Sequence, residues 1–286
     1  MLSILIVNWN TRELLRRCLM SIQEFAPKSP YEIIVVDNAS SDGSAQMVAD
    51  EFPSVRLEKN PNNVGYAAAN NQAFRLAKGD LLLTLNPDTE FFDDSLDKLV
   101  FPDSDVGCLA AKLVDSPGAS PQRSIRRFPR PILMLLEILG LHKGYRALDF
   151  DYSRPGEAEQ AMGTFVLFRK EALDAVGLMD ERFPIFFNDV DLLYRLRLAG
   201  WRTWYSPDVQ VIHHGGASTK QVRKSMIWES HRSLIRYYWK WYSRWWSWPL
   251  LVLFSAVVWL GALVRAGGWD AGSGGLLLSS GCAVLR

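Results

Sequence analysis

The chain has 286 residues, 48% of them hydrophobic, which is enough for one large domain with an extension and too few for three domains. Its 32 basic and 31 acidic residues leave a formal net charge of +1, so no overall field favours nucleic acid as a partner. Three widely spaced cysteines without CxxC or Cys/His spacing argue against a disulfide or zinc framework and fit a reducing compartment.

The first hundred residues alternate between short apolar runs and amphipathic segments, which is typical of βα units. The apolar run at 2–7 has the length of a strand and follows no basic segment, so it predicts a strand and not a signal peptide. Further elements are expected as a helix after Thr11, a strand at 31–36, a helix from 41 or 42 to about 52, a short strand at 55–57, a helix at 66–77 and a strand at 80–85. This order predicts a Rossmann-like α/β fold whose mostly parallel central sheet is flanked by helices.

Polar side chains follow each of these predicted strands. They are Asn8 and Asn10 after the first, Asp37 after the second, the stretch 60–65 with Asn63 after the third, and Asn86 and Asp88 after the fourth. Open α/β sheets bind ligands at the carboxyl ends of their strands, so a binding site is expected here. The chain lacks GxGxxG and GxxxxGK[ST] motifs, which argues against NAD and P-loop nucleotides. Asp37 could accept hydrogen bonds from a nucleoside and Asp88 could bind a divalent cation on a diphosphate, although each alone could equally form a turn.

An arginine-rich loop, QRSIRRFPR, occupies residues 122–130. The guanidinium groups of Arg123, Arg126 and Arg127 suit phosphate oxygens, because each presents a planar fork of donors. A solvated charged surface explains the same run slightly better. The apolar stretch 132–141 that follows predicts a helix that packs beside the site or against lipid.

The segment FNDVDLLYRLRLAGW at 187–201 predicts a helix with acidic residues in its first turn. Asp191 lies four residues before Arg195, so the two are expected to form an ion pair on the helix surface. The strand-like run 203–214 ends in His213 and His214, and alternation would send their side chains to opposite faces. One of the two imidazoles could therefore join Asp88 in binding Mn²⁺ or Mg²⁺.

The composition changes after about residue 225. The segment YYWKWYSRWWSW at 237–248 is aromatic and basic, as is common where a chain meets lipid headgroups. No charged residue occurs from Trp245 to Val264, and a helix over this stretch would reach about 30 Å at about 1.5 Å per residue. Basic residues between 232 and 244 outnumber the single Arg265 beyond it, which predicts that the preceding domain lies in the cytoplasm. Residues 225–286 are thus expected to anchor the chain to membrane lipid, either spanning the bilayer or lying on it, with a soluble tail as the alternative.

A series of segments occurs in a characteristic order over most of residues 1–220. They are ILIVNWN (4–10), IIVVDNASSDGS (33–44), NNVGYAAANNQAF (62–74), LLLTLNPDT (81–89), GTFVLFRKEAL (163–173), FNDVDLLYRLRLAGW (187–201) and VIHHGGAS (211–218). Together they resemble the inverting family 2 glycosyltransferases of the GT-A fold, especially the rhamnosyltransferase-like members of bacterial surface polysaccharide synthesis. The resemblance implies a GT-A domain at 1–224, with a nucleotide-sugar-binding half at 1–100 and an acceptor and catalytic half at 101–224.

The resemblance also implies roles for individual residues. The sequence NPD at 86–88 stands where the family has a DxD-like motif, which leaves Asp88 as the acidic metal ligand, and the rhamnosyltransferase-like group commonly shows this replacement. Asn188-Asp189 stands where the family usually has Glu-Asp, which leaves Asp189 as the general base. Of the two histidines the resemblance favours His214 as a metal ligand. The implied donor contacts are Asn8, Asn10, Asp37, Asn63, Gly65, Asn70, Asn86 and Asp88.

These features predict a metal-dependent inverting glycosyltransferase that moves a hexose or deoxyhexose from a nucleoside diphosphate sugar to a saccharide acceptor. Rhamnose from dTDP-rhamnose is the first hypothesis, with UDP- and GDP-sugars left open, and the membrane segment favours an acceptor on a polyprenyl diphosphate. The alternative is a non-catalytic nucleotide-sugar-binding or scaffold protein of a polysaccharide assembly complex, which NPD and Asn188 would suit. A nucleotidyltransferase would need a basic glycine-rich loop near the first strand, and NWNTRE does not provide one.

Overall fold

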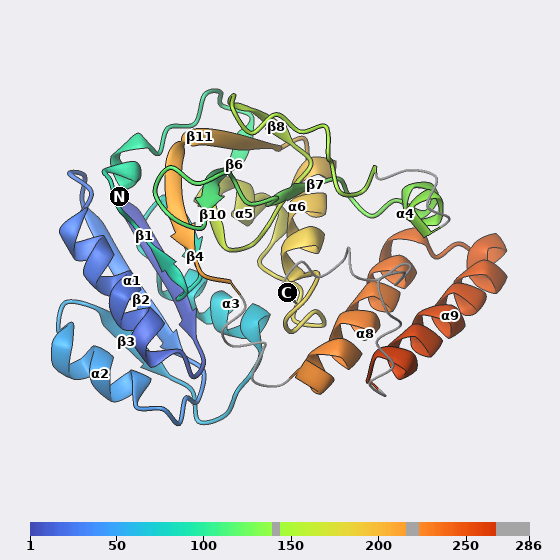
Figure 1. Ribbon diagram of the computed structural model, residues 1–286, viewed down its shortest axis with the longest axis horizontal. Coiled ribbons are helices and arrows are strands. Elements are labelled where there is room, and N and C mark those ends of the chain that lie inside the picture. The colour runs from blue at the N-terminus through green and yellow to red at the C-terminus, as the bar shows by residue number, and fades with distance from the viewer. Residues whose placement is uncertain (139–143, 216–222, 267–286) are drawn as a thin grey trace.

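The computed structural model describes residues 1–138, 144–215 and 223–266, with a central sheet, helices on both of its faces and a helical hairpin at one side (Figure 1). The helices are α1 (Arg12–Glu24), α2 (Ser44–Glu51), α3 (Tyr66–Leu76), α4 (Pro131–Ile138), α5 (Lys170–Val176), α6 (Asn188–Leu198), α8 (Arg223–Tyr242) and α9 (Trp248–Ala266), with short 3₁₀ turns η1 (Ser95–Lys98) and η2 (Trp245–Ser247). The strands are β1 (Leu2–Asn8), β2 (Tyr31–Asp37), β3 (Arg56–Lys59), β4 (Leu81–Leu85), β5 (Thr89–Glu90), β6 (Val106–Val114), β7 (Ile125–Arg126), β8 (Gly156–Ala158), β9 (Gln160–Ala161), β10 (Phe165–Arg169) and β11 (Arg202–His213). The expected α/β fold with helices around a central sheet is confirmed.

The main sheet has the strand order β3-β2-β1-β4-β10-β6-β11-β5, and β8 also pairs with β11. The strands from β3 to β4 are parallel, as the alternating pattern predicted. Strand β10 differs, because it runs antiparallel to both β4 and β6, so the sheet as a whole is mixed. This pairing places Phe165 opposite Leu85 and brings the residues before β10 to the carboxyl end of β4. The expected binding edge therefore receives residues from both halves of the chain.

Both faces of the sheet are covered, which is why its central strands are continuous apolar runs. In β1, Leu5 and Val7 belong to a core shared with α3, α5, α6 and α8. Ile4 and Ile6 belong to a second core shared with α1 and α2. Burial of an aliphatic side chain of this size contributes about 1.5–3 kcal/mol, so these alternating residues fix the register of the strand.

The element boundaries depart from the expected ones at a few points. The strand expected at 55–57 lies at Arg56–Lys59. The helix expected from 41 or 42 starts at Ser44, because Gly43 before it has a left-handed φ of 84°. Asp42 still accepts the Ser44 N–H at 3.0 Å, which satisfies one free donor of the first turn.

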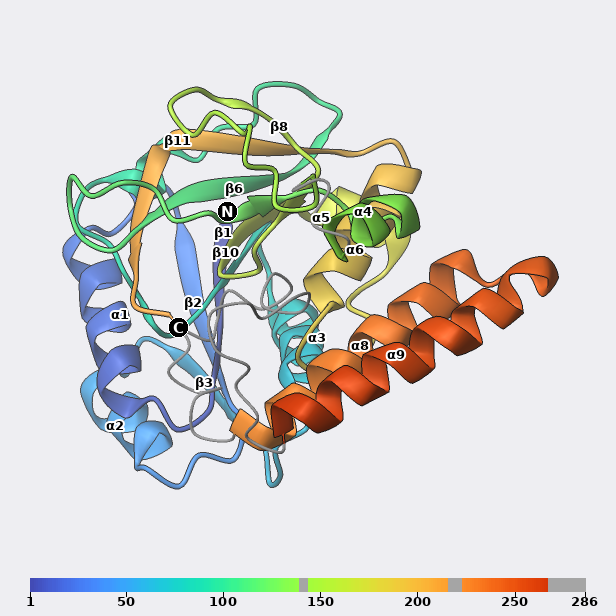
Figure 2. The same ribbon diagram turned by 45° about the vertical axis from the view of Figure 1, so that its right-hand side comes forward.

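The C-terminal helices α8 and α9 lie side by side as a hairpin that extends away from the sheet (Figure 2). The ring of Tyr238 in α8 packs on that of Phe254 in α9, tilted by 37° with ring centres 4.6 Å apart. The indole of Trp239 donates to the Ser255 hydroxyl at 3.1 Å. Tyr237 of α8 is completely buried in the core that also contains α3, α5 and α6. Helix α8, which begins at Arg223, two residues before the expected anchor segment, therefore shares a core with the rest of the domain.

Candidate active site

The polar residues at the ends of β1 and β2 form one hydrogen-bonded network. Asn8 Nδ2 donates to Asp37 Oδ1 at 3.0 Å and to Ser40 Oγ at 3.0 Å. Asp37 Oδ2 accepts the Ser40 N–H at 3.0 Å, and Asn10 Oδ1 accepts the Ser41 N–H at 2.8 Å. Asn8 and Asp37 are buried. The network thus joins three of the expected donor residues and fixes the shape of the loop after β2.

A second network joins the end of β2 to the start of α3. Asn38 Nδ2 donates to Asn63 Oδ1 at 2.8 Å, and Asn38 Oδ1 accepts the Val64 N–H at 3.0 Å. Gly65 has a φ of 89°, and a Cβ there would lie 3.0 Å from Pro184 Cβ. Asn63 and Gly65 therefore lie at this edge as expected. Sequence reasoning missed Asn38, although it directly follows Asp37.

Tyr66, the first residue of α3, lies between the ends of β4 and α6. Its hydroxyl donates to Asn86 Oδ1 at 3.1 Å, while its carbonyl accepts a hydrogen bond from Asn70 at 2.9 Å. Burial raises the pKa of the Tyr66 hydroxyl, and the charges of Asp189 and Asp88 raise it further. Tyr66 therefore stays protonated within reach of both charges. It was not among the expected site residues, and its only sequence signal is its place next to Gly65.

Asp189 lies in the first turn of α6 and is partly exposed. Its Oδ2 accepts the Gly163 N–H at 3.0 Å and its Oδ1 accepts the Val190 N–H at 2.8 Å. A Cβ on Gly163 would lie 3.2 Å from Asp189 Cβ, so the glycine permits this close approach. Burial raises the pKa of Asp189, and the two backbone N–H groups and the charge of Arg126 offset this only in part. The result is a carboxylate that is more basic than an ordinary aspartate.

The neighbours of Asp189 are held inside the protein. Asn188 is buried and donates to the carbonyl of Ile185 at 2.7 Å. Asp191 accepts a hydrogen bond from Arg195 Nε at 3.0 Å, which confirms the expected pair. The pair is not on the surface, however, because Asp191 is completely buried and α8 lies over it. Asp189 is thus the acid of this turn that is partly exposed.

Asp88 and His213 form the candidate metal position. His213 Nε2 lies 3.7 Å from Asp88 Oδ1, and both side chains are 8% exposed. His214, which the resemblance favoured, lies instead with its Nε2 2.8 Å from Glu90 Oε1. Strand β11 extends to His213 opposite Thr89, and strand alternation sends the side chain of His214 to the other face, so the role of His214 as a ligand stays a prediction.

The chemistry of these two residues fits a divalent cation. Burial lowers the pKa of His213, which keeps the imidazole in the neutral form that binds metals. A carboxylate oxygen and an imidazole nitrogen are donors that Mn²⁺ accepts, and Mg²⁺ commonly takes its remaining ligands from substrate phosphates and water. Among residues 1–138, 144–215 and 223–266, no group of three or more His, Cys, Asp and Glu is placed to hold a metal. Oxygens of a bound diphosphate would complete the set.

The arginines of the 122–130 loop have different surroundings. Arg126 lies close enough to Asp189 for its charge to lower the pKa of that carboxyl. Arg127 instead donates to the Gly144 carbonyl at 2.8 Å and pairs with Asp149 at 2.6 Å. Arg123 is exposed. The structure therefore brings Arg126 to the site and engages Arg127 elsewhere.

Polar side chains at the strand ends, a carboxylate–imidazole pair and a second, basic carboxylate meet at one edge of the sheet, an arrangement that suits the GT-A glycosyltransferase class. The chain matches the Glycosyl transferase family 2 profile over residues 3–177 and belongs to that family. The protein is therefore a glycosyltransferase.

Known proteins give the same assignment. The chain is 29% identical over 270 residues to N-acetylglucosaminyl-diphospho-decaprenol L-rhamnosyltransferase of Mycobacterium tuberculosis, which covers 87% of each chain. Its structure resembles the mannosyltransferase PcManGT from Pyrobaculum calidifontis in complex with GDP-Man and Mn²⁺, with a TM-score of 0.57, 20% identity, and coverage of 96% of this chain and 76% of that one. It also resembles GalNAc-T7 with UDP, GalNAc and Mn²⁺, with a TM-score of 0.58, 20% identity, and coverage of 74% and 42%. At these identities the structural likeness establishes the GT-A fold alone.

Proposed function

We propose that the protein is a metal-dependent inverting rhamnosyltransferase that uses dTDP-rhamnose and a saccharide acceptor on a polyprenyl diphosphate. The rhamnosyl donor and the lipid-linked acceptor rest on the mycobacterial relative, whose name describes such an acceptor. The Mn²⁺-bound structural neighbours support the metal. The observation that carries the catalytic proposal is the partly exposed Asp189, with its raised pKa, at the start of α6.

In the proposed reaction, Asp189 removes a proton from the acceptor hydroxyl. The hydroxyl oxygen forms a bond to the anomeric carbon while the bond from that carbon to the diphosphate oxygen breaks on the opposite face, so the configuration inverts. The proton ends on Asp189 and the electron pair of the broken bond leaves with the diphosphate. Asp88 and His213 would hold the divalent cation, which when bound balances the charge of that leaving group.

The donor is proposed to lie along the strand ends. The nucleoside would rest against the loop after β2, which is shaped by Asn8, Asn10 and Asp37. The opposite side of the nucleoside would be formed by Asn63 and Gly65. The test is a thermal-shift and turnover screen against dTDP-, UDP- and GDP-sugars, each with and without Mn²⁺ or Mg²⁺. Metal-dependent stabilisation by dTDP-rhamnose with release of dTDP supports the proposal. If only UDP- or GDP-sugars give this response, dTDP-rhamnose is not the donor.

The pH dependence of the reaction is a specific test of the base. Because the pKa of Asp189 is raised, the acidic limb of kcat/KM should lie at higher pH than an ordinary aspartate would give, with activity lost as the pH falls through that pKa. The charge of Arg126 lowers the pKa of Asp189, so Arg126→Gln should move this limb to still higher pH. Arg127→Gln is the matched control, since Arg127 pairs with Asp149. If the acidic limb of kcat/KM lies at the same pH in the wild type and in both variants, Asp189 is not the general base.

Helix α9 is proposed to hold the enzyme on the cytoplasmic face of the membrane. The stretch Trp245–Ala266, which contains an 18-residue window with a mean hydropathy of 2.0, is long and apolar enough to cross a bilayer. Its outward face exposes Leu250, Leu253, Val257 and Leu260. Its other face packs on α8, which carries charged residues such as Glu229 and Arg232, and these would be costly in hydrocarbon. The packing therefore favours a helix that lies in the bilayer surface over one that spans it.

Removing apolar side chains from this face should weaken lipid binding. The double variant Leu253→Gln and Leu260→Gln is expected to lower binding to anionic vesicles at least roughly tenfold, because each leucine loses about 1.5–3 kcal/mol of apolar burial. Vesicle flotation measures the effect. Met20→Gln, which changes an exposed apolar residue of α1, is the control. Unchanged binding of the double variant would contradict the proposed lipid face.

A further inference from the structure

We propose that Lys240 and Trp241 of α8 are positioning residues that hold the Asp189 carboxylate in place by fixing Asp191. The proposal rests on the proposed role of Asp189 as the base. It assigns to the hairpin of α8 and α9 a second task besides membrane attachment, because the residues that contact Asp191 lie near the end of α8 from which α9 turns back.

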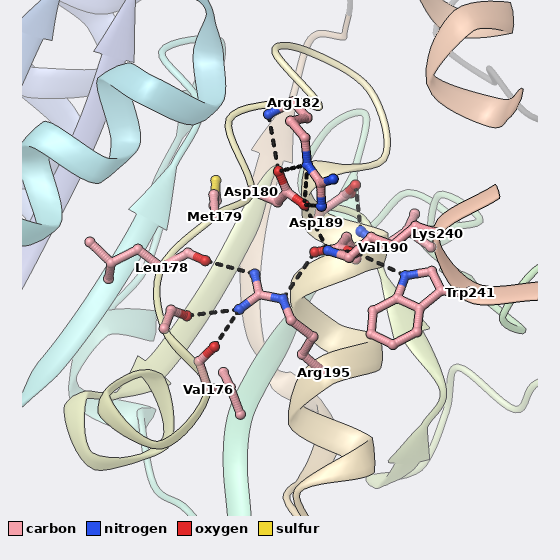
Figure 3. Close-up of polar contacts among 12 residues, drawn as sticks. Val176, Leu178, Met179, Asp180, Arg182, Asp189, Val190, Arg195, Lys240 and Trp241 are labelled. Carbon is pink, nitrogen blue, oxygen red and sulfur yellow. Dashed lines mark hydrogen bonds and ion pairs between the residues drawn. The ribbon is translucent and has the colours of Figure 1, made fainter. Parts of the chain in front are cut away.

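The first observation is the set of contacts around Asp191. Lys240 Nζ lies 2.6 Å from Asp191 Oδ1, and the Trp241 indole donates to the same oxygen at 2.9 Å, while Arg195 occupies Oδ2 (Figure 3). Lys240 also lies 2.7 Å from Asp180 Oδ2. Asp191 is completely buried, so none of these partners can be replaced by bulk water at low cost. The carboxylate is thus fixed by α8 on one side and by its own helix on the other.

The second observation is that Asp191 closes the helical turn that carries Asp189. The Asp191 N–H donates to the Phe187 carbonyl at 2.9 Å, and Asp189 lies within that turn. A shift of Asp191 therefore moves the backbone of Asp189. Asp189 in turn depends on that backbone for its hydrogen bonds to the Gly163 and Val190 N–H groups.

The third observation is strain at the start of the same turn. Phe187 has a left-handed φ of 67°, which a residue with a bulky side chain adopts only when its surroundings hold it there. Its ring packs on Tyr237 of α8, with centres 5.5 Å apart. Helix α8 thus contacts both ends of the turn, Phe187 through Tyr237 and Asp191 through Lys240 and Trp241.

The hairpin offers a matched pair of substitutions for the test. Trp241→Phe removes the indole hydrogen bond to Asp191, and Trp239→Phe removes one to Ser255 within the hairpin. The ring of Trp241 packs on Tyr194, and phenylalanine can keep part of that contact. Lys240→Met removes the charge but keeps the aliphatic stem, and Lys240→Arg restores the charge. The full-length proteins are assayed in detergent for kcat and for the KM of the donor.

We expect Trp241→Phe and Lys240→Met to lower kcat about 10- to 100-fold with the donor KM changed less than about twofold, because a displaced base affects the chemical step and not donor binding. Lys240→Arg should restore most of kcat, and Trp239→Phe should stay within about twofold of the wild type. An unchanged kcat in Trp241→Phe, or an equal loss in Trp239→Phe, overturns the proposal. If Lys240→Met fails to fold, Trp241→Phe decides.

The Asp189→Asn variant separates this proposal from the proposed role of the base. If Asp189→Asn is inactive while Trp241→Phe is fully active, only the positioning role is rejected. If Asp189→Asn is active, Asp189 is not the base.

Discussion

The Asp189→Asn enzyme is expected to lose kcat by a factor on the order of 10²–10⁴ while its affinity for the donor and metal stays within about twofold. Asparagine has nearly the same shape as aspartate and can still accept one of the N–H groups of Gly163 and Val190, but it cannot take up the acceptor proton. Steady-state transfer rates and donor binding by thermal shift measure the two quantities separately. The control is Asp174→Asn on the exposed face of α5.

The two quantities together separate catalysis from folding. A variant that binds donor and metal normally but transfers no sugar has lost a group that acts in the chemical step. A variant with the wild-type rate would show that another group takes the proton, and Asp189 would then be a structural acid of the α6 N-terminus. Loss of both rate and donor binding would indicate a folding defect, which the unfolding midpoint would reveal.

The second large effect concerns the metal. A donor–metal complex present at 100 times its Kd adds about 2.7 kcal/mol to the free energy of unfolding, and Asp88→Asn should remove most of this gain. His213→Ala should reduce it in the same direction, because the His213 ring faces Asp88. His214→Ala should leave it nearly unchanged, since that ring pairs with Glu90.

Comparing the two adjacent histidines decides which of them binds the metal. Thermal unfolding is followed with donor alone, with Mn²⁺ alone and with both. If His214→Ala removes the metal-dependent gain and His213→Ala keeps it, then the expectation from sequence was correct and the binding of donor reorders the end of β11. Equal stability gains in all variants would place the metal elsewhere.

The sequence predicted the parts of the fold that depend on local periodicity. The buried runs at 2–7, 31–36 and 80–85 became neighbouring parallel strands, and the polar residues after them met at one edge, because carboxyl ends of parallel strands must do so. The antiparallel insertion of β10 between β4 and β6 depends on distant pairing, which has no local signal.

The candidate site was predictable to the same extent. Alternation showed that His213 and His214 face opposite ways, but which one faces Asp88 depends on the register of β11 against β5, which lies more than a hundred residues away. The i,i+4 spacing correctly paired Asp191 with Arg195. The burial of Asp191 could not be foreseen, because Asp191 is covered by residues near 240, and the composition of that segment indicated contact with lipid.

The position of β10 limits how the enzyme can move. Strand β10 is hydrogen-bonded on one side to β4, which ends at the proposed donor residues, and on the other to β6 from the second half of the chain. The two halves therefore share one continuous ladder and cannot rotate about a hinge between them without breaking it. We expect the sheet to stay rigid during turnover, and the amide hydrogens of Val166, Leu167 and Phe168 should be among the slowest to exchange in the protein.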